Sequence, residues 1–483
     1  MDHSRTEEEG RAASVAELIA RWAAARPEAI FLEDARSERK VDYAELARSA
    51  ASATAAFAAA GIGPDGAVLL EVADPLDFTL VYLAALASGA RVVPIAPGSS
   101  AETIAVLGAR FDGTVLHVSD RTAAGLLTGE GLVPTGHGSA VLFTSGSTGT
   151  PKGVELDEDR LLHVAGAVAA HNALTPADRG FNPLPLFHIN AEVVAVLATL
   201  VAGATLVLDR RFRRTGFWEL LAERRITWVN AVPAILAILA AAGEVTPPAS
   251  VRFVRSASAP LPGPVRTAFA GVPLVVSYGM TEAASQITAT PLDGSAPAGS
   301  VGRPVSAELE VRDGAGERMP AGELGEVWVR GAGIVRGYFE GTAAERFDAQ
   351  GWLRTGDLGS VDADGFVTLA GRSDDVINRG GELVYPSDVE EVLLGDPHVR
   401  EAVVVARPDE MLGQVPVAFV VTAEPVDHTE AALLADALAR RCTRVLPRAL
   451  RPVSITVDAE LPRAATGKVQ RARLRAALAG KAE

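Results

Sequence analysis

The chain has 483 residues, a formal net charge of −15 and a hydrophobic fraction of 48%. This length is too great for one ordinary core, so we expect two or more domains. The charged fraction of 22% is close to the soluble average and predicts a large, conventional core. An acidic surface repels nucleic acid and anionic membranes, so we expect neither as a partner, and a local basic pocket for one nucleotide stays compatible.

The single cysteine, the histidine spacing and the N-terminal residues argue against a secreted protein and against one stabilised by a structural metal. Cys442 is the only cysteine and is expected to pack as a small hydrophobe, and the eight histidines show no zinc-type spacing. Residues 1–12 are charged and lack the apolar segment of a signal peptide, so we expect a disordered tail. The longest apolar run, 193–208, is interrupted by Gly203 and is short for a membrane span. We therefore expect a cytoplasmic protein with no membrane span.

The first half of the chain alternates predicted helices with short apolar strands. An alanine-rich helix at 44–62 ends in a glycine and is followed by a strand at 67–73, a helix at 78–90 and a strand at 91–96. Further short β-branched runs occupy 203–209, 226–232, 251–258 and 273–279. This alternation predicts a parallel sheet covered by helices on both faces, with ligands beyond the carboxyl ends of the strands.

The pattern changes near Ser300. Alternating strands at 308–313, 322–331 and 366–371, separated by Gly/Asp turns, predict a smaller antiparallel unit. Beyond it, helices at 387–395 and 430–442 and strands at 401–408 and 417–423 predict an α+β module large enough for its own core. We place a boundary near Ser373 and expect a large domain at 13–372 and a small domain at 373–483.

Residues 143–154, with the sequence FTSGSTGTPKGV, have the composition of a loop that binds phosphate. Hydroxyl side chains and glycine amides are suitable donors to phosphate oxygens. The spacing is not that of a Walker loop, because Pro151, Lys152 and Gly153 occupy the positions where that motif needs Gly-Lys-Ser/Thr. A flexible Gly/Ser linker is the weaker alternative, since a strand-like segment precedes the loop and a lysine follows it.

Three further segments carry candidate chemistry. The segment 277–285, SYGMTEAAS, offers Tyr278 for stacking on a base and Glu282 for magnesium, although taken alone it fits an ordinary helix start better. Asp357, after a Thr-Gly pair, is a natural acceptor for ribose hydroxyls. Lys468 lies in a glycine-containing loop near the C-terminus, and nothing intrinsic marks it as catalytic.

Seven segments in this order resemble the acyl-adenylate-forming superfamily of acyl-CoA synthetases, carrier-protein adenylation domains and firefly-type luciferases. They are FTSGSTGTPKGV, PLPLFH, SYGMTEAAS, GELGEVWVRG, TGDLG, GRSDDVINRGG and LPRAATGK. The resemblance implies an α/β fold, in which two doubly wound subdomains and a distorted antiparallel β-barrel form the large domain. A small, mobile α+β C-terminal domain follows.

The resemblance also implies roles for individual positions. Lys468 would bridge the substrate carboxylate and the α-phosphate, Thr281 would contact that phosphate, and Glu282 and Thr144 would bind Mg²⁺. The small domain would rotate about a hinge at Asp374 and bring Gly380 and Gly381 to the coenzyme A tunnel. The positions implied around ATP or AMP are Thr144, Ser145, Gly146, Ser147, Thr148, Gly149 and Lys152 at the β- and γ-phosphates, Ala257, Ser258, Ala259, Ser277, Tyr278, Gly279 and Met280 at the adenine and α-phosphate, and Asp357 and Arg372 at the ribose.

The residues predicted to line the acyl pocket limit the class of carboxylic acid that we expect as the substrate. Its implied wall residues are Phe187, His188, Ile189, Asn190, Ser256, Ala257 and Gly279. Amino-acid-activating relatives carry an aspartate where this chain has His188 after Phe187, which favours the CoA-ligase branch. The walls are small or apolar, so we expect a hydrophobic or bulky acid, while a likeness to oxalate-type ligases leaves small dicarboxylates open.

The expected activity is ATP-dependent activation of a small-molecule carboxylic acid through acyl-AMP, followed by transfer to coenzyme A. The alternatives are a stand-alone adenylation enzyme that loads a carrier protein, or an enzyme that performs one of the two half-reactions. A nucleotide-binding regulatory protein without catalysis is disfavoured by Lys468, Glu282 and Asp357. The protein is expected to be a monomer or a homodimer.

Overall fold

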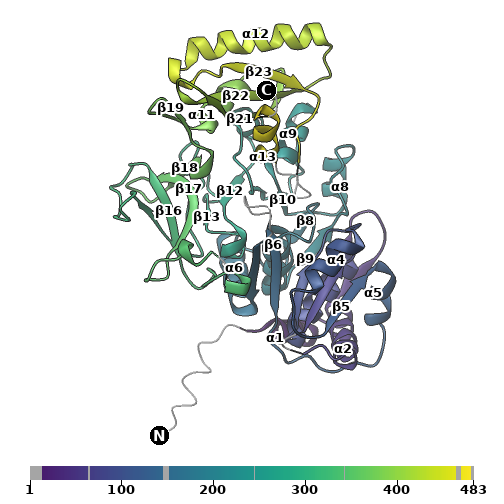
Figure 1. Ribbon diagram of the computed structural model, residues 1–483. Helices are drawn as coiled ribbons and strands as arrows, with labels where there is room; N and C mark the ends of the chain where they lie inside the picture. The colour runs from purple at the N-terminus through teal and green to yellow at the C-terminus, as the bar shows by residue number, and fades with distance from the viewer. Residues whose placement is uncertain are drawn as a thin grey trace.

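A computed structural model describes residues 13–63, 66–144, 152–243, 245–341, 343–463 and 469–479, without the side chains of Thr144 and Ala479. In the described residues, two sheets built mainly from parallel strands form the large N-terminal part, as the strand–helix alternation predicted. Figure 1 shows β5 and α2 of this part at the lower right, and α12 and β23 of the C-terminal part at the top.

The first sheet has five strands in the order β5-β3-β4-β6-β7. Its strands are β3 (Ala67–Glu71), β4 (Arg91–Pro94), β5 (Val115–Ser119), β6 (Ser139–Thr144) and β7 (Lys152–Asp157). Strands β5, β3, β4 and β6 are mutually parallel, and β7 runs antiparallel to β6. The segment predicted to bind phosphate therefore connects two antiparallel neighbours at one end of this sheet.

The second sheet has nine strands in the order β14-β13-β12-β11-β10-β8-β9-β1-β2. They are β1 (Ile30–Asp34), β2 (Lys40–Asp42), β8 (Arg179–Asn182), β9 (Thr205–Leu208), β10 (Trp228–Ala231), β11 (Phe253–Ser256), β12 (Leu274–Tyr278), β13 (Thr288–Ala289) and β14 (Arg303–Pro304). The run from β12 to β1 is parallel, so the carboxyl ends of β8, β10, β11 and β12 lie along one edge.

Helices cover both parallel sheets and begin and end at residues that the sequence supplies for that purpose. The helix α3 starts on Pro75 behind the Asp74 side chain, which accepts hydrogen bonds from Leu76 and Asp77, and it stops at Gly89 with a φ of 87°. The helices are α1 (Val15–Ala25), α2 (Tyr43–Ala59), α3 (Pro75–Ser88), α4 (Ala101–Gly108), α5 (Asp120–Leu126), α6 (Glu158–His171), α7 (Ala198–Ala202), α8 (Phe217–Glu223), α9 (Pro233–Ala241) and α10 (Gly263–Ala268).

The apolar run at 193–208 forms a buried helix and a buried strand, as predicted. Its helical part begins as a π-helix, η2 (Asn190–Leu197), continues as α7 and leads into β9. No helix of the described residues has the length and hydrophobicity needed to cross a bilayer.

The expected antiparallel unit contains a four-stranded sheet in the order β15-β16-β17-β18. Its strands are β15 (Glu308–Arg312), β16 (Gly325–Arg330), β17 (Leu353–Val361) and β18 (Val367–Arg372). Short 3₁₀ turns lie beside it, η3 (Thr281–Ala283), η4 (Phe339–Gly341) and η5 (Ala344–Arg346). Asp357 lies within β17 and is paired with Arg372 of β18, so the Thr-Gly pair before it is part of a strand.

The C-terminal part has a core of its own, built on a five-stranded sheet. Cys442 is 1% exposed within this core, where burial raises the pKa of its thiol, in line with the expected packing role. The elements are β19 (Ile377–Arg379), β20 (Glu382–Val384), α11 (Pro386–Leu394), β21 (Val399–Asp409), β22 (Gly413–Thr422), α12 (His428–Val445), β23 (Ser454–Asp458) and α13 (Arg471–Ala479).

Glu192 on η2 makes the stability of the large part depend on pH. Its carboxyl is fully buried, and burial raises its pKa to about 8 although the Tyr82 hydroxyl donates to it. Because this value is above the ordinary 4.5, the stabilisation is complete below pH 4.5 and is lost as pH rises through 8. We expect Glu192→Gln to raise the thermal midpoint above that of the wild type at pH 9 and to change it little at pH 4.5.

The measurement is thermal unfolding of both proteins across this pH range. The exposed Glu219 provides the control, because Glu219→Gln should leave the pH dependence of the wild type intact. Parallel curves for Glu192→Gln and the wild type would contradict the assigned pKa shift.

Candidate active site

The strand ends of the second sheet bring together residues that are distant in sequence. Ser256 is the last residue of β11 and Tyr278 the last of β12, and the two strands are adjacent and parallel. Ligands of parallel sheets bind beyond such ends. The predicted adenine segment at 257–259 and the turn that begins at Gly279 therefore leave the sheet side by side.

The predicted phosphate loop lies mostly outside the described residues. The side chain of Thr144 and all of Ser145, Gly146, Ser147, Thr148 and Gly149 belong to that part. Its two flanks are described, since Thr144 ends β6 and pairs in register with Lys152 at the start of β7. Phe143 packs edge-on against Phe111 and Phe339, with ring centroids 6.5 and 6.4 Å apart, which anchors the base of the hairpin.

Tyr278, Asp357 and Arg372 form one cluster; the resemblance implied the ribose for Asp357 and Arg372 and the adenine for Tyr278. The Tyr278 hydroxyl donates to Asp357 Oδ2 at 2.5 Å, and Arg372 Nη1 donates to Oδ1 at 3.2 Å. Burial, reinforced by the charge of Asp357, raises the pKa of the Tyr278 phenol well above its usual value, so it stays a donor. The cluster presents one fixed carboxylate between an aromatic ring and a cation.

Glu282 is the centre of a second cluster. Its Oε1 accepts a hydrogen bond from the Tyr338 hydroxyl at 2.5 Å and forms an ion pair with Arg346 Nη1 at 3.0 Å. The ammonium of Lys152 lies over the ring of the same Tyr338, 5.8 Å from its centroid. The predicted phosphate lysine and the predicted metal ligand thus meet through one tyrosine.

Thr355 joins the two clusters. Its carbonyl oxygen accepts from Arg346 Nη2 at 3.0 Å and from Arg372 Nη1 at 3.2 Å. Its hydroxyl accepts from the backbone N–H of Asp357 at 3.0 Å and donates to the carbonyl of Val327. Arg346 and Thr355 therefore hold Glu282 and Asp357 at a fixed separation.

The turn after β12 has a backbone conformation that few residue types can adopt. A Cβ on Gly279 would stand 1.4 Å from the carbonyl oxygen of Ser285, so this position requires glycine. Ala284 and Ser285 have positive φ angles of 46° and 92°, which are uncommon outside glycine. Met280 and Thr281 follow Gly279 directly, and Thr281 begins the three-residue turn η3, so the helix that the segment alone would predict does not form.

The predicted acyl-pocket residues lie beside the adenine segment. Ser258 has a φ of 76°, and its hydroxyl accepts from Asn190 Nδ2 at 3.3 Å. Phe187 and His188 are partly exposed and have ring centroids 4.4 Å apart. The His188 carbonyl accepts from the N–H groups of Ala191 and Glu192, which places His188 and Ile189 at the start of η2.

Comparison with known proteins adds the family. Residues 19–124 and 132–339 match the AMP-binding enzyme family, and residues 388–468 match the C-terminal domain of AMP-binding enzymes. The chain belongs to the AMP-binding enzyme family. The predicted membership of the acyl-adenylate-forming superfamily and the predicted fold are confirmed.

Relatives of this AMP-binding enzyme include named CoA ligases. The chain is 35% identical to sulfoacetate–CoA ligase of Cupriavidus necator over 95% of its own length and 97% of the relative. It is 32% identical to oxalate–CoA ligase of Arabidopsis thaliana, over 85% and 88%. A solved structure of o-succinylbenzoate CoA synthetase from Bacillus subtilis with its acyl-adenylate has a TM-score of 0.84 at 28% identity, covering 95% of this chain and 97% of that one.

Three further positions carry roles that the resemblance implied. Lys468 is outside the described residues. Asp374 lies in the 3₁₀ turn η6 (Ser373–Asp375), between the large and small parts. Gly380 and Gly381 form the turn between β19 and β20, with positive φ angles of 62° and 95°.

The sequence did not single out Tyr338, Arg346 and Thr355. Tyr338 follows the segment GAGIVRG at 331–337, and Val335 of this segment donates a backbone hydrogen bond to the Glu282 carbonyl. An aromatic and a basic residue on short irregular segments carry no periodic signal. Of these three residues, Thr355 alone lies in a motif that the sequence analysis names: it is the first residue of TGDLG, two residues before Asp357.

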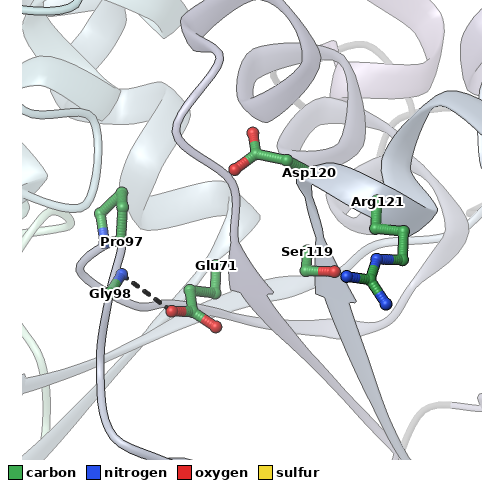
Figure 2. A pocket seen from close by; sticks show the side chains of 6 residues that line it. All are labelled: Glu71, Pro97, Gly98, Ser119, Asp120 and Arg121. Carbon is green, nitrogen blue, oxygen red and sulfur yellow. Dashed lines mark hydrogen bonds between the residues drawn. The ribbon is translucent and has the colours of Figure 1, made fainter.

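A separate depression lies at the carboxyl ends of β3 and β5, on the other parallel sheet (Figure 2). It measures about 340 Å³ and is lined by Glu71, Pro97, Gly98, Ser119, Asp120 and Arg121. Its acids are already engaged, since Glu71 accepts from the Gly98 N–H and pairs with His117, and Asp120 accepts from two backbone N–H groups. We assign it no part in the candidate site.

The described residues fit a magnesium ion that arrives with a nucleotide. Among them no group of three or more His, Cys, Asp or Glu side chains could hold a metal by itself. Mg²⁺ needs no such group, because it is usually bound by one or two carboxylates together with substrate phosphates and water. Glu282, beside Lys152 and Tyr338, offers one carboxylate where phosphates are expected.

Proposed function

We propose that this AMP-binding enzyme is an ATP-dependent acid–CoA ligase that forms an acyl-adenylate and transfers the acyl group to coenzyme A. The observation that carries the proposal is the joined pair of clusters, Tyr278–Asp357–Arg372 and Glu282–Tyr338–Lys152. One cluster suits a ribose and the other suits metal-bound phosphates, and Thr355 links them. The relatives named above are CoA ligases.

In this proposal each cluster binds one part of ATP. Asp357 accepts the ribose hydroxyls while Arg372 and Tyr278 keep its carboxylate in place. Lys152 and the hydroxyl-rich loop bind the β- and γ-phosphates, and Glu282 binds Mg²⁺. The ion offsets negative charge on the phosphates. Lys468 approaches the α-phosphate during attack by the substrate carboxylate, which stabilises charge in the transition state.

The proposal includes rotation of the small domain about Asp374. The two residues that flank Asp374 are bound to different parts of the chain. The Ser373 hydroxyl donates to the Gly356 carbonyl of β17, in the large part, at 3.1 Å. Asp375 forms an ion pair with Arg475 of α13, in the small part, at 3.0 Å. A hinge at Asp374 lets each neighbour keep its partner, and the rotation would carry Gly380 and Gly381 toward coenzyme A.

The acceptor is tested by supplying ATP, Mg²⁺ and a panel of carboxylic acids with either coenzyme A or a phosphopantetheinylated carrier protein. The proposal predicts an acyl-CoA thioester, detected by mass, together with AMP. A thioester on the carrier protein alone would favour the stand-alone adenylation enzyme. Absence of any thioester, even from supplied acyl-adenylates, would refute the ligase.

A further inference from the structure

Arg255 is a fully buried cation in the second sheet. It lies on β11 with an exposed fraction of 1%, although the neighbouring positions of this strand are apolar or small. The run at 251–258 was predicted as a short β-branched strand, and the predicted walls of the acyl pocket were small or apolar. A charge in this place requires compensation, because burial of an ion without a counter-charge is costly.

The partners of Arg255 are all neutral amide oxygens. Gln286 Oε1 accepts from Nε at 3.2 Å and from Nη2 at 2.8 Å, and Asn190 Oδ1 and Asn230 Oδ1 accept from Nη1 at 3.1 Å each. Within the described residues no carboxylate lies within the 4.0 Å of an ion pair with this guanidinium. Burial lowers its pKa to about 9, so the group remains a cation at neutral pH.

Two buried hydrogen-bond donors beside this cation have no partner in the part of the chain that the structure describes. The amide nitrogen of Gln286 is buried and has no hydrogen-bond partner among the described residues, although the oxygen of the same amide holds Arg255. The buried hydroxyl of Ser277 is likewise without a partner there. Arg255 pairs with Val275 of β12, so Ser277, two residues on, points to the same face of the sheet. An anion is the ligand that a cation and spare donors recognise together.

This cluster lies directly behind the predicted acyl pocket. Asn190 connects the two, because its oxygen accepts from Arg255 while its nitrogen donates to Ser258 of the adenine segment. Asn190 is also two residues after His188, at the start of η2. The guanidinium is therefore hydrogen-bonded directly to one residue of the predicted pocket wall, Asn190.

We propose that Arg255 is the counter-charge for a second anionic group on the substrate, so that the acid is a short carboxylic acid with a carboxylate or sulfonate at its other end. This inference rests on the proposed ligase function. Gln286 and Ser277 supply further donors to the distal anion, while the first carboxylate reacts with ATP. The expectation of a hydrophobic or bulky acid is replaced by this class.

The test compares acids of similar length with and without the second charge. Sulfoacetate, malonate and succinate form one set, and propanoate and butanoate form the other. For each acid, kcat/KM is measured with ATP and coenzyme A by AMP release. We expect the wild type to favour the dianionic set, and Arg255→Met to lower the ratio of dianionic to monoanionic kcat/KM by about 10- to 100-fold.

The variant Gln286→Glu distinguishes a loss of substrate binding from a loss of folding stability. The new carboxylate replaces an amide of the same shape, keeps both bonds from Arg255 and neutralises the cation from inside the protein. We expect its thermal midpoint to equal or exceed that of the wild type, while the ratio of dianionic to monoanionic kcat/KM falls by about 10- to 100-fold. Arg213→Met, at an exposed arginine, is the control that leaves the ratio unchanged.

Two results would overturn the inference while the ligase stands. They are equal kcat/KM for both sets of acids in the wild type, and an unchanged ratio in a folded Gln286→Glu protein. AMP release that no acid of either set stimulates would instead remove the proposed function, and the inference with it.

Discussion

Lys468→Ala is expected to abolish adenylation and to leave thioester formation from a supplied acyl-adenylate largely intact. A lysine that stabilises the charge developing on the α-phosphate contributes only to the first half-reaction, and loss of one such donor costs about 10²- to 10³-fold in rate. The measurement is acid-dependent release of pyrophosphate for the first step and conversion of acyl-AMP to acyl-CoA for the second. Both steps are followed in the same protein preparation.

Lys481→Ala is the matched control, because Lys481 is also a lysine near the C-terminus but lies outside the motif LPRAATGK. It should retain both half-reactions. Equal losses in both steps for Lys468→Ala would contradict the assigned role and the rotation of the small domain about Asp374.

Asp357→Asn is expected to raise the KM for ATP by about 10- to 100-fold with a smaller effect on unfolding. The asparagine keeps an acceptor for the Tyr278 hydroxyl but removes the charge that binds Arg372 and the ribose, and hydrogen bonds to a charged group contribute about 1.5–3 kcal/mol. The measurement is ATP affinity by calorimetry together with steady-state kinetics. Thermal unfolding is recorded alongside.

Asp364→Asn provides the comparison, since Asp364 is exposed in the turn between β17 and β18. Its KM for ATP should match that of the wild type. Unchanged ATP affinity in Asp357→Asn would show that this carboxylate does not bind the nucleotide.

Local sequence patterns were sufficient for several strands of the parallel sheets. The β-branched run at 251–258 contains β11 at 253–256, and the run at 273–279 contains β12 at 274–278. A short apolar run between helices is typical of a buried strand in a parallel sheet. The π-helical start of η2 was not predictable, because an apolar run shows the same pattern for α- and π-turns.

The two halves of the candidate site differed in how far the sequence could predict them. Tyr278, Glu282 and Asp357 stood in recognisable motifs, and the structure brings Tyr278 to Asp357 directly. Arg346 was not predictable, because its contact with Glu282 joins residues 64 positions apart on irregular segments.

Arg255 shows a different limit. A charged residue in a strand is ordinarily assigned to a solvated face, and only the packed structure reveals that this one faces three amides. Those amides come from η2, β10 and the segment after η3, so no local pattern connects them. Long-range polar networks of this kind are decided by tertiary packing rather than by periodicity.

The central claim is that the chain activates a carboxylic acid as an acyl-adenylate. Exchange of labelled pyrophosphate into ATP, measured without coenzyme A across the acid panel, tests it most directly because only reversal of adenylation produces the signal. The account predicts exchange that requires both Mg²⁺ and an acid and that disappears in Lys468→Ala. Exchange that no acid stimulates, from a protein that binds ATP, would contradict the account.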